Sequence, residues 1–308
     1  MEENKTLADG FLLLGFSRHS PQPFLTFIMV LLAFLISVLG NLGFLTLMCS
    51  DHRLHKPMYF FLSNLSFLDI CNTSVTLSTL LESLLKEKTF ISFSLCMTQL
   101  CFFLIFISTE FFLLTAMAYD RYVAICRPLH YTVMMNKRIC ILLVATSWIT
   151  GCLDILPMEI LISRFSYCGA NEINHFFCDP NSMMKLSCSD THNLEALILI
   201  EAVLFALIPF ILTLASYTFI IAAILRIHST QGRLKAFSTC SSHLTVVILF
   251  YGTLISIYMR PNSMSSPDSD KFFSLLYTTL IPVLNPIIYT LRNKEVKNAL
   301  RKVGGRKY

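Results

Sequence analysis

The segment "MAYDRYVAIC", residues 117–126, places an acid and a base side by side at the end of a long apolar block, residues 92–119. Such a pair is costly in the hydrocarbon interior of a membrane, but it is tolerated at the membrane–water boundary or against a protein partner. Asp120 and Arg121 therefore predict a membrane-spanning helix that ends at such a boundary.

The composition agrees with this interpretation, because the 308 residues are 55% hydrophobic and 14% charged, with a mean hydropathy of +0.64. A soluble domain of this size needs more charge on its surface. Seven apolar blocks reach the length of about 20 residues with which a helix crosses a bilayer. They predict an all-α membrane protein, a seven-transmembrane helix bundle, because barrel strands would alternate over only about 10 residues. The blocks are residues 24–49, 57–82, 92–119, 139–162, 194–225, 236–259 and 271–291.

The basic residues outside the blocks predict the orientation of the chain in a membrane. With an external N-terminus, fifteen of the 24 Lys and Arg residues lie on the cytoplasmic side and eight lie outside. Because positive charge collects on the cytoplasmic side, we expect an external tail, residues 1–23, and a cytoplasmic tail, residues 292–308. The tail 1–23 holds only the short apolar run "FLLLGF", so we expect no cleavable signal peptide. No separate soluble domain is visible, so we expect one seven-helix domain over 1–308.

Eleven cysteines are present, and seven of them lie in or beside the apolar blocks. The remaining four lie in the predicted external layer, where an even number suggests two disulfides, with three pairings open. A zinc site is the alternative, because His175 and His192 share the loop. In the external tail, Asn4 begins an Asn-Lys-Thr glycosylation motif. The four external cysteines are Cys96, Cys168, Cys178 and Cys188.

Four acids lie well inside the apolar blocks: Asp69, Glu110, Asp154 and Glu201. Intramembrane carboxylates are costly and usually functional. Asp69 and Glu110 lie at compatible depths, within reach of two asparagines, Asn41 and Asn285. Oxygen ligands of this kind suit a small cation such as sodium, or a pair of acids that shares one proton. The alternative is a polar network that only fixes helix packing.

The last block contains "PVLNPIIY", residues 282–289, and its two prolines predict a kink. The following segment, "TLRNKEVKNALRKV", is basic and has Val296, Leu300 and Val303 at helical spacing. It predicts a short amphipathic helix on the inner membrane leaflet.

The motifs of common enzymes are missing from the sequence: there is no P-loop, no HExxH and no GxSxG. We therefore expect neither enzymatic activity nor a nucleic-acid partner. A transporter would favour a two-fold repeat, which seven dissimilar blocks do not provide. Signalling remains the best interpretation.

Several motifs together resemble the rhodopsin-like G-protein-coupled receptors, and among them the odorant (olfactory) receptors. The broad superfamily is indicated by the DRY sequence at 120–122 and by NPxxY at 285–289. The narrower resemblance is carried by "LHKPMYFFLSNLSFLDIC" at 54–71, "MAYDRYVAICRPLHY" at 117–131 and "KAFSTCSSHL" at 235–244.

This resemblance implies a receptor in the plasma membrane that binds an odorant and activates a stimulatory G protein, which raises cyclic AMP. It further implies the disulfides Cys96–Cys178 and Cys168–Cys188. Asp69 and Glu110 match the sodium-site acids, and a sodium ion is the only cofactor expected. Asp120, Arg121 and Tyr122 match the motif that meets the G protein.

Two features depart from the broad superfamily. The sixth block has "FYG" at 250–252 in place of a Trp-x-Pro switch. The foot of this block reads Arg233-Leu234-Lys235 where many relatives have an acid that holds the arginine. An acid latch of that kind cannot form here.

The candidate ligand pocket lies in the outer halves of the third, fifth and sixth blocks. Its lining is apolar with a few polar groups, which suits a small, mostly hydrophobic molecule held by one or two hydrogen bonds. Phe103 stands where amine receptors have an aspartate, so an amine ligand is disfavoured. Alternatives are a rhodopsin-like receptor for a non-odorant ligand, or a seven-helix transporter. The predicted lining is Phe103, Leu104, Ile107, Ser108, Glu201, Ala202, Phe205, Tyr251, Leu254 and Tyr258.

Overall fold

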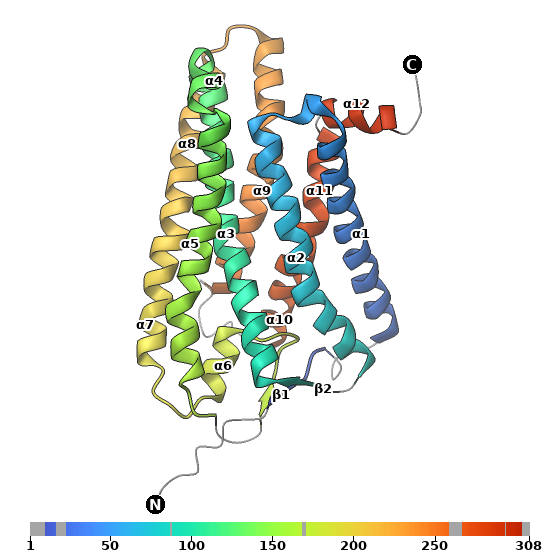
Figure 1. Cartoon of the computed structure of the whole chain (residues 1–308), viewed down its shortest axis with the longest axis vertical. Helices are drawn as coiled ribbons and strands as arrows, with labels where there is room; N and C mark the ends of the chain where they lie inside the picture. Colours follow the sequence, from blue (N-terminus) through green and yellow to red (C-terminus); the bar gives the residue numbers. More distant parts are fainter. Residues whose placement is uncertain are drawn as a thin grey trace, which may run out of the picture.

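The computed structural model describes residues 10–16, 23–86, 88–167, 171–258, 267–292 and 294–303. Long helices run side by side along its long axis, and a short helix lies across one end (Figure 1). A small sheet lies at the opposite end. We call these the α12 end and the sheet end.

Within the described residues, seven helical rods form the bundle that the sequence predicts. Three of them are single helices joined by short turns: α1 (Pro23–Ser50), α2 (Pro57–Leu85) and α3 (Phe93–Cys126). The fourth is α5 (Lys137–Ser163), and the sixth is α9 (Thr230–Tyr258). The fifth joins α7 (His192–Glu201) to α8 (Ile208–Leu225). The seventh joins α10 (Pro267–Leu275) to α11 (Ile281–Arg292).

Short elements connect the rods. At the α12 end these are η1 (His52–Leu54), η2 (Pro128–His130), α4 (Tyr131–Met134) and α12 (Lys294–Val303). At the sheet end they are α6 (Pro180–Leu186) and the three strands β1 (Gly10–Leu13), β2 (Thr89–Ser92) and β3 (Glu172–Ile173). Side chains begin two of the rods: Ser92 Oγ accepts from the Leu95 amide, and Asn136 Oδ1 accepts from the Ile139 amide.

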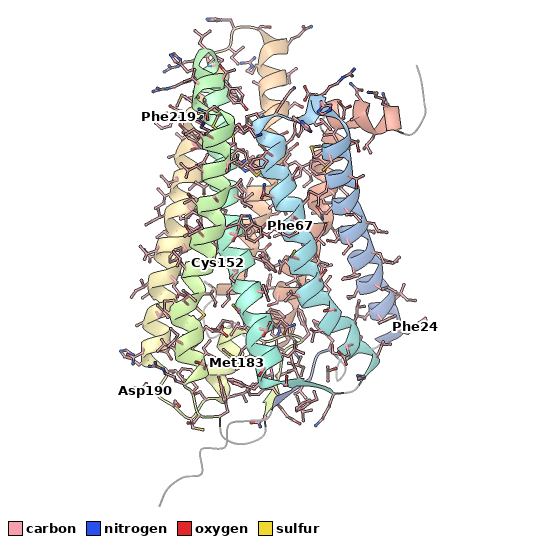
Figure 2. The ribbon with its side chains drawn as sticks, viewed as in Figure 1. Phe24, Phe67, Cys152, Met183, Asp190 and Phe219 are labelled. Atoms are coloured by element: carbon pink, nitrogen blue, oxygen red, sulfur yellow. A yellow bond between two sulfur atoms is a disulfide. The ribbon has the colours of Figure 1, made fainter. Side chains whose placement is uncertain are left out.

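Five of these helices are long and apolar enough to cross a membrane, and a sixth span is added if the bent pair within α9 counts as one. With 29 residues, the rod α2 is also long enough to cross a membrane. It is not among these five because it carries polar residues such as Asn64, Asp69 and Asn72. Large apolar side chains face outward around the bundle, for example Phe67, 52% exposed, and Phe219, 61% exposed (Figure 2). An outer surface of this kind suits lipid and would be unfavourable in water.

Two rods contain π-helical turns, which the sequence analysis did not predict, although it expected a kink in the seventh block. Residues Ala202–Leu207 and Leu276–Leu280 form π-helical turns. Each turn stands directly before a segment that has proline in its first turn, Pro209 or Pro282. A proline ring clashes with the carbonyl four residues earlier, and a wider turn relieves this clash. The helix then continues through Pro286.

The strands form a sheet in the order β2-β1-β3. The central strand β1 pairs antiparallel with β2, Gly10 opposite Ser92, and parallel with β3, Leu12 opposite Glu172. The sequence analysis assigned this run to an external tail and expected no strand in it, whereas Phe11 and Leu13 are fully buried. The strand closes the sheet end of the bundle.

The helix α3 is the centre of the bundle, packing against α2, α5, α8 and α9. Its approach to α5 depends on Gly151. A Cβ at that position would lie 2.4 Å from Thr109 Oγ1 and 2.8 Å from the Ile105 carbonyl oxygen. Only a residue without a side chain permits this contact between the two helices.

We predict that Gly151→Ala destabilises the protein by about 1–3 kcal/mol, because the added methyl group must push α3 and α5 apart. The measurement is the midpoint of thermal unfolding of the purified protein in detergent. Gly43→Ala is the matched control, because a Cβ there meets nothing within 4 Å. Equal midpoints for the two variants would contradict the close approach of α3 and α5.

Candidate ligand and transducer sites

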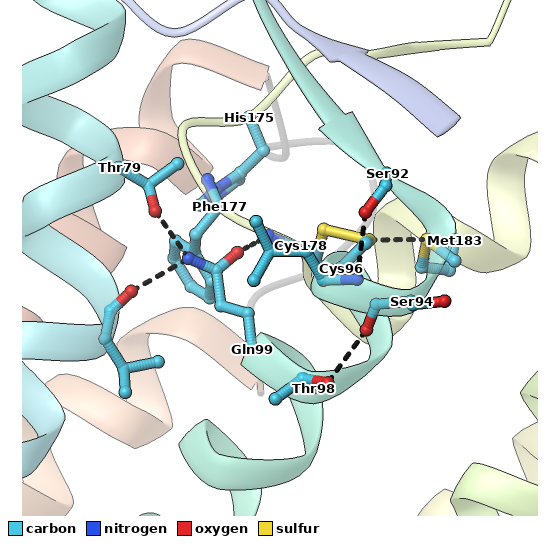
Figure 3. The surroundings of a disulfide bond; sticks show 12 residues. Thr79, Ser92, Ser94, Cys96, Thr98, Gln99, His175, Phe177, Cys178 and Met183 are labelled. Atoms are coloured by element: carbon cyan, nitrogen blue, oxygen red, sulfur yellow. Dashed lines mark hydrogen bonds between the residues drawn. A yellow bond between two sulfur atoms is a disulfide. The ribbon is translucent and has the colours of Figure 1, made fainter. Parts of the chain in front are cut away.

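A disulfide between Cys96 and Cys178 ties the loop before α6 to the first turn of α3, the pairing that the resemblance implies (Figure 3). Cys188 also takes part in a disulfide. Cys168, the other member of its predicted pair, lies outside the described residues, as does Asn4. The described residues contain no group of three or more His, Cys, Asp or Glu side chains that could hold a metal ion.

Gln99 forms a second tether for the same loop, which sequence reasoning missed. Its amide nitrogen donates to the Val75 carbonyl and to Thr79 Oγ1, each at 2.8 Å. Its amide oxygen accepts from the Cys178 backbone N–H at 3.0 Å (Figure 3). The side chain therefore joins α2, α3 and the loop independently of the sulfur bridge.

Aromatic rings of this loop form the roof of the candidate pocket. The Phe177 ring lies 4.8 Å from the ring of Phe103 on α3. The ring of His175 is buried against Phe176 and Phe177, with 4.7 and 4.5 Å between the ring centroids. Burial, reinforced by the positive charge of Lys271, lowers the pKa of His175 to about 3, so the ring is neutral at physiological pH. The roof is thus uncharged at this point.

Four of the predicted lining residues lie in one hydrophobic cluster: Phe103, Ile107, Tyr251 and Leu254. Leu104 is half-buried and packs against this cluster. Tyr251 lies 4.6 Å from Phe210 of α8 and 5.5 Å from Phe111 of α3. These rings pack together among α3, α8 and α9. The side chain of Tyr258 lies outside the described part of the chain.

The remaining predicted lining residues lie differently from what α-helical spacing implies. Ser108 donates its hydroxyl to the Asp154 carboxylate, so it faces α5 rather than the aromatic cluster. Ala202 is exposed and begins the π-helical turn of the fifth rod. Phe205 packs edge-on against Phe112 at 6.1 Å.

Glu201 and Asp154 form a pair of acids between α3, α5 and α7, on the side of α3 to which Ser108 points. Glu201 lies close enough to Asp154 for their charges to interact. Each carboxyl group has one buried oxygen without a hydrogen-bond partner in the described structure, Glu201 Oε1 and Asp154 Oδ1. Unsatisfied buried oxygens are costly, so the pair is suited to a hydrogen bond with a polar group of a ligand.

Deeper in the bundle, a buried polar layer joins four helical rods. Asn285 donates to Asp69 Oδ2 at 2.9 Å, and Tyr277 donates to Glu110 Oε2 at 3.2 Å. Asn41 donates to the Pro282 carbonyl at 3.0 Å. Asp69 and Glu110 are each 1% exposed and interact electrostatically. The structure thus brings together the acids and asparagines that the sequence analysis grouped.

At the α12 end, the buried Asp120 is held from two sides. Arg121 Nη2 lies 3.2 Å from Asp120 Oδ2. Tyr131, in the loop after α3, donates to Asp120 Oδ1 at 2.8 Å. Burial and the neighbouring Asp120 raise the pKa of Tyr131, which keeps the phenol protonated as a donor. Tyr122 packs between Tyr119 and Phe219, at 6.3 and 6.0 Å.

Helices α8 and α9 are joined near Arg121 by a contact between Tyr217 and His243. The sequence analysis missed it, as it missed the Gln99 tether. The Tyr217 hydroxyl lies 2.6 Å from His243 Nδ1, and both residues are buried. Tyr217 also donates to the Cys240 carbonyl at 3.4 Å. The only sequence signal for this contact is the pair of polar groups inside apolar blocks.

The helix α12 packs onto the bundle with Val296 and Ala299 buried. Glu295 lies 2.5 Å from Lys56 Nζ and accepts from the Tyr59 hydroxyl at 2.8 Å. Although burial opposes ionisation, these two hydrogen bonds lower the pKa of Glu295. The helix is thereby fixed beside the junction of α1 and α2.

The sequence profile of one protein family, described as olfactory receptor, matches residues 30–307. The chain belongs to the olfactory receptor family. It is 50% identical to olfactory receptor 8U3 of Mus musculus over 301 residues, which cover 98% of this chain and 94% of that protein. It is 48% identical to olfactory receptor 1F1 of Homo sapiens over 303 residues, 98% and 97% of the two chains.

Membership in this family confirms three predictions: the resemblance to the odorant receptors, the seven-helix fold and the absence of enzymatic activity. The protein is an odorant receptor and a multi-pass membrane protein, and coupling to G proteins is general in its family. In this receptor the Asp120–Arg121 pair lies near the end of α3, and Arg121 interacts electrostatically with Glu295 of α12.

We predict that Tyr131→Phe raises the basal G-protein activation of the receptor severalfold. The change removes a hydrogen bond to a buried carboxylate, which is worth about 1.5–3 kcal/mol, and so weakens the hold on Asp120. The measurement is ligand-free signalling normalised to surface expression. Val133→Ala, at a 70% exposed position in the same loop, is the control. Basal activity equal to that of the unmodified receptor would contradict a restraining role for Tyr131.

Proposed function

We propose that the receptor binds a small, mostly hydrophobic odorant at the sheet end, among α3, α8 and α9, and activates a stimulatory heterotrimeric G protein at the α12 end. The activated G protein raises cyclic AMP. One observation carries this proposal: an apolar, aromatic site beneath a tethered loop and an Asp-Arg-Tyr motif lie at opposite ends of the same helix, α3. A single rigid element can therefore transmit a change between them.

The proposed location is the plasma membrane, with the N-terminus outside and the C-terminus in the cytoplasm. Two features support this orientation. The excess of Lys and Arg belongs to the loops and tail at the α12 end. The disulfide Cys96–Cys178 lies at the sheet end, where an oxidising compartment would let it persist.

The direct test is a panel of odorants applied to cells that express the receptor and report cyclic AMP. We expect at least one small hydrophobic compound to raise cyclic AMP in these cells, and the response to vanish when the stimulatory G protein is deleted. A ligand response that persists without this G protein would contradict the proposed coupling. Ligand uptake without signalling would point to transport.

Glu201, beside Asp154 between α3, α5 and α7, orients the polar end of the ligand. An acid in an apolar site holds its proton unless a cation is near. A protonated carboxyl group donates a hydrogen bond to a ketone, an ester or a ring nitrogen. The favoured odorant is therefore neutral and carries one acceptor.

We predict that Glu201→Gln changes the potency of a neutral odorant by less than about threefold, because glutamine also donates a hydrogen bond whose net worth is about 0.5–1.5 kcal/mol. An amine odorant would instead lose most of its potency. Leu254→Ala serves as the comparison, because truncating an apolar contact costs about 1–3 kcal/mol for either ligand. A severe loss for a neutral odorant in Glu201→Gln, with Leu254→Ala silent, would overturn this assignment.

The buried acids Asp69 and Glu110 form a site for sodium or for one shared proton. Three buried oxygens without a hydrogen-bond partner among the described residues support an oxygen-ligated cation: Glu110 Oε1, Asn41 Oδ1 and Asn72 Oδ1. When bound, sodium would supply the positive charge that lets both carboxylates ionise. Asp69 and Glu110 would hold it, and Asn285 would orient Asp69.

We predict that the potency of an agonist depends on sodium concentration in the unmodified receptor and not in the double variant Asp69→Asn, Glu110→Gln. Both substitutions keep the side-chain shape and remove the charge that attracts the cation. The measurement is a set of agonist dose–response curves at graded sodium, with osmolarity held by choline. The same sodium dependence in both proteins would assign the acids to helix packing alone.

A further inference from the structure

Two histidine side chains face each other on the turn between α1 and α2. His52 Nδ1 and His55 Nδ1 lie 3.4 Å apart, and the two ring planes cross at 83°. The backbone of the turn fixes this arrangement. The Leu54 amide donates to the Asp51 carbonyl, and the His55 amide donates to the His52 carbonyl at 3.2 Å. The buried side chain of Leu54 anchors the turn to the bundle.

The second nitrogen of His55 determines which of its nitrogens carries the proton. His55 Nε2 lies 3.1 Å from the Met48 carbonyl oxygen, which can only accept a hydrogen bond. In the neutral ring Nε2 therefore carries the proton, and Nδ1 presents a lone pair toward His52. A histidine that binds a metal nearly always donates its other N–H to a carbonyl or carboxylate in this manner.

The distance between the two nitrogens fits a shared metal ion as well as a long hydrogen bond. Hydrogen bonds from N–H groups usually span about 2.7–3.2 Å, so 3.4 Å is long for such a bond. Two imidazole nitrogens on a tetrahedral zinc ion, each bound at about 2.0–2.1 Å, lie about 3.3–3.4 Å apart. The observed distance matches the edge of that tetrahedron.

We propose that His52 and His55 form a two-histidine site for a divalent transition-metal cation of the zinc and copper class. Imidazole suits these ions, whereas calcium and magnesium require oxygen ligands. Two positions on the ion remain for water. The site lies beside α12, next to the Lys56–Glu295 pair. A bound ion would stiffen the turn on which that ion pair depends.

The test is zinc binding to the purified full-length receptor in detergent, measured by competition with a fluorescent zinc chelator. We expect the unmodified receptor to bind one zinc ion more than His52→Asn, or to bind it at least tenfold more tightly. His55→Asn should show the same loss. His228→Asn, at an exposed position between α8 and α9, is the control and should bind zinc as the unmodified receptor does.

A second readout reports on the turn itself. In the unmodified receptor, zinc should slow the hydrogen exchange of the amides between residues 52 and 56, and magnesium should not. Unchanged zinc binding in His52→Asn would overturn the proposal, because that variant lacks one of the two proposed ligands. Equal slowing of exchange by magnesium would overturn it as well.

Discussion

Polar groups inside a membrane bundle must find partners within the protein, because lipid offers none. In this receptor that constraint falls mainly on α3. Its Ser108 bonds to Asp154 of α5, its Glu110 accepts from Tyr277 of the seventh rod, and its Asp120 accepts from Tyr131 of the following loop. One helix is thus bonded to a different neighbour at each of three depths, and the positions of its neighbours follow from these bonds.

The same arrangement connects the two proposed sites. Phe103, beneath the loop ring of Phe177, lies 6.2 Å from the Tyr277 ring. Tyr277 packs against Phe250 at 5.9 Å and donates to Glu110. A ligand that displaces Phe103 therefore acts on the group that satisfies a buried acid. Because packed interiors respond by discrete rearrangement, a small shift here can alter the balance of states of the whole bundle.

The sequence predicts the rods and the buried acids well, because bilayer thickness and the cost of burying charge act on local residue patterns. Asp69 and Asn285 lie at matching depths in their own helices, as their positions along the apolar blocks predict. Asp120 and Arg121 are neighbours in the sequence and lie at the predicted end of α3. Two features could not be predicted from the sequence, because they depend on contacts between distant segments. The strand β1 forms only when β2 and β3 flank it, and Gln99 becomes a tether only when the loop brings the Cys178 amide to it.

Ala202 and Ser108 lie apart from the aromatic cluster for a different reason. Ala202 lies on the predicted lining only if the fifth rod is a continuous α-helix, whereas a π-helical turn precedes Pro209. For Ser108, the spacing along α3 gives its approximate direction, but Asp154 on another helix determines where its hydroxyl points. Helical periodicity therefore identifies the region of the pocket, and contacts between helices select its lining.

The central claim is that odorant binding at the sheet end opens the α12 end around Arg121. The most direct measurement is the distance between probes at Leu129, 91% exposed, and Leu234 on α9, 64% exposed. Probes introduced as non-natural amino acids would leave the free cysteines unlabelled. The account predicts that an active odorant together with the stimulatory G protein lengthens this distance by several ångströms. An odorant that raises cyclic AMP while the distance distribution stays unchanged would contradict it.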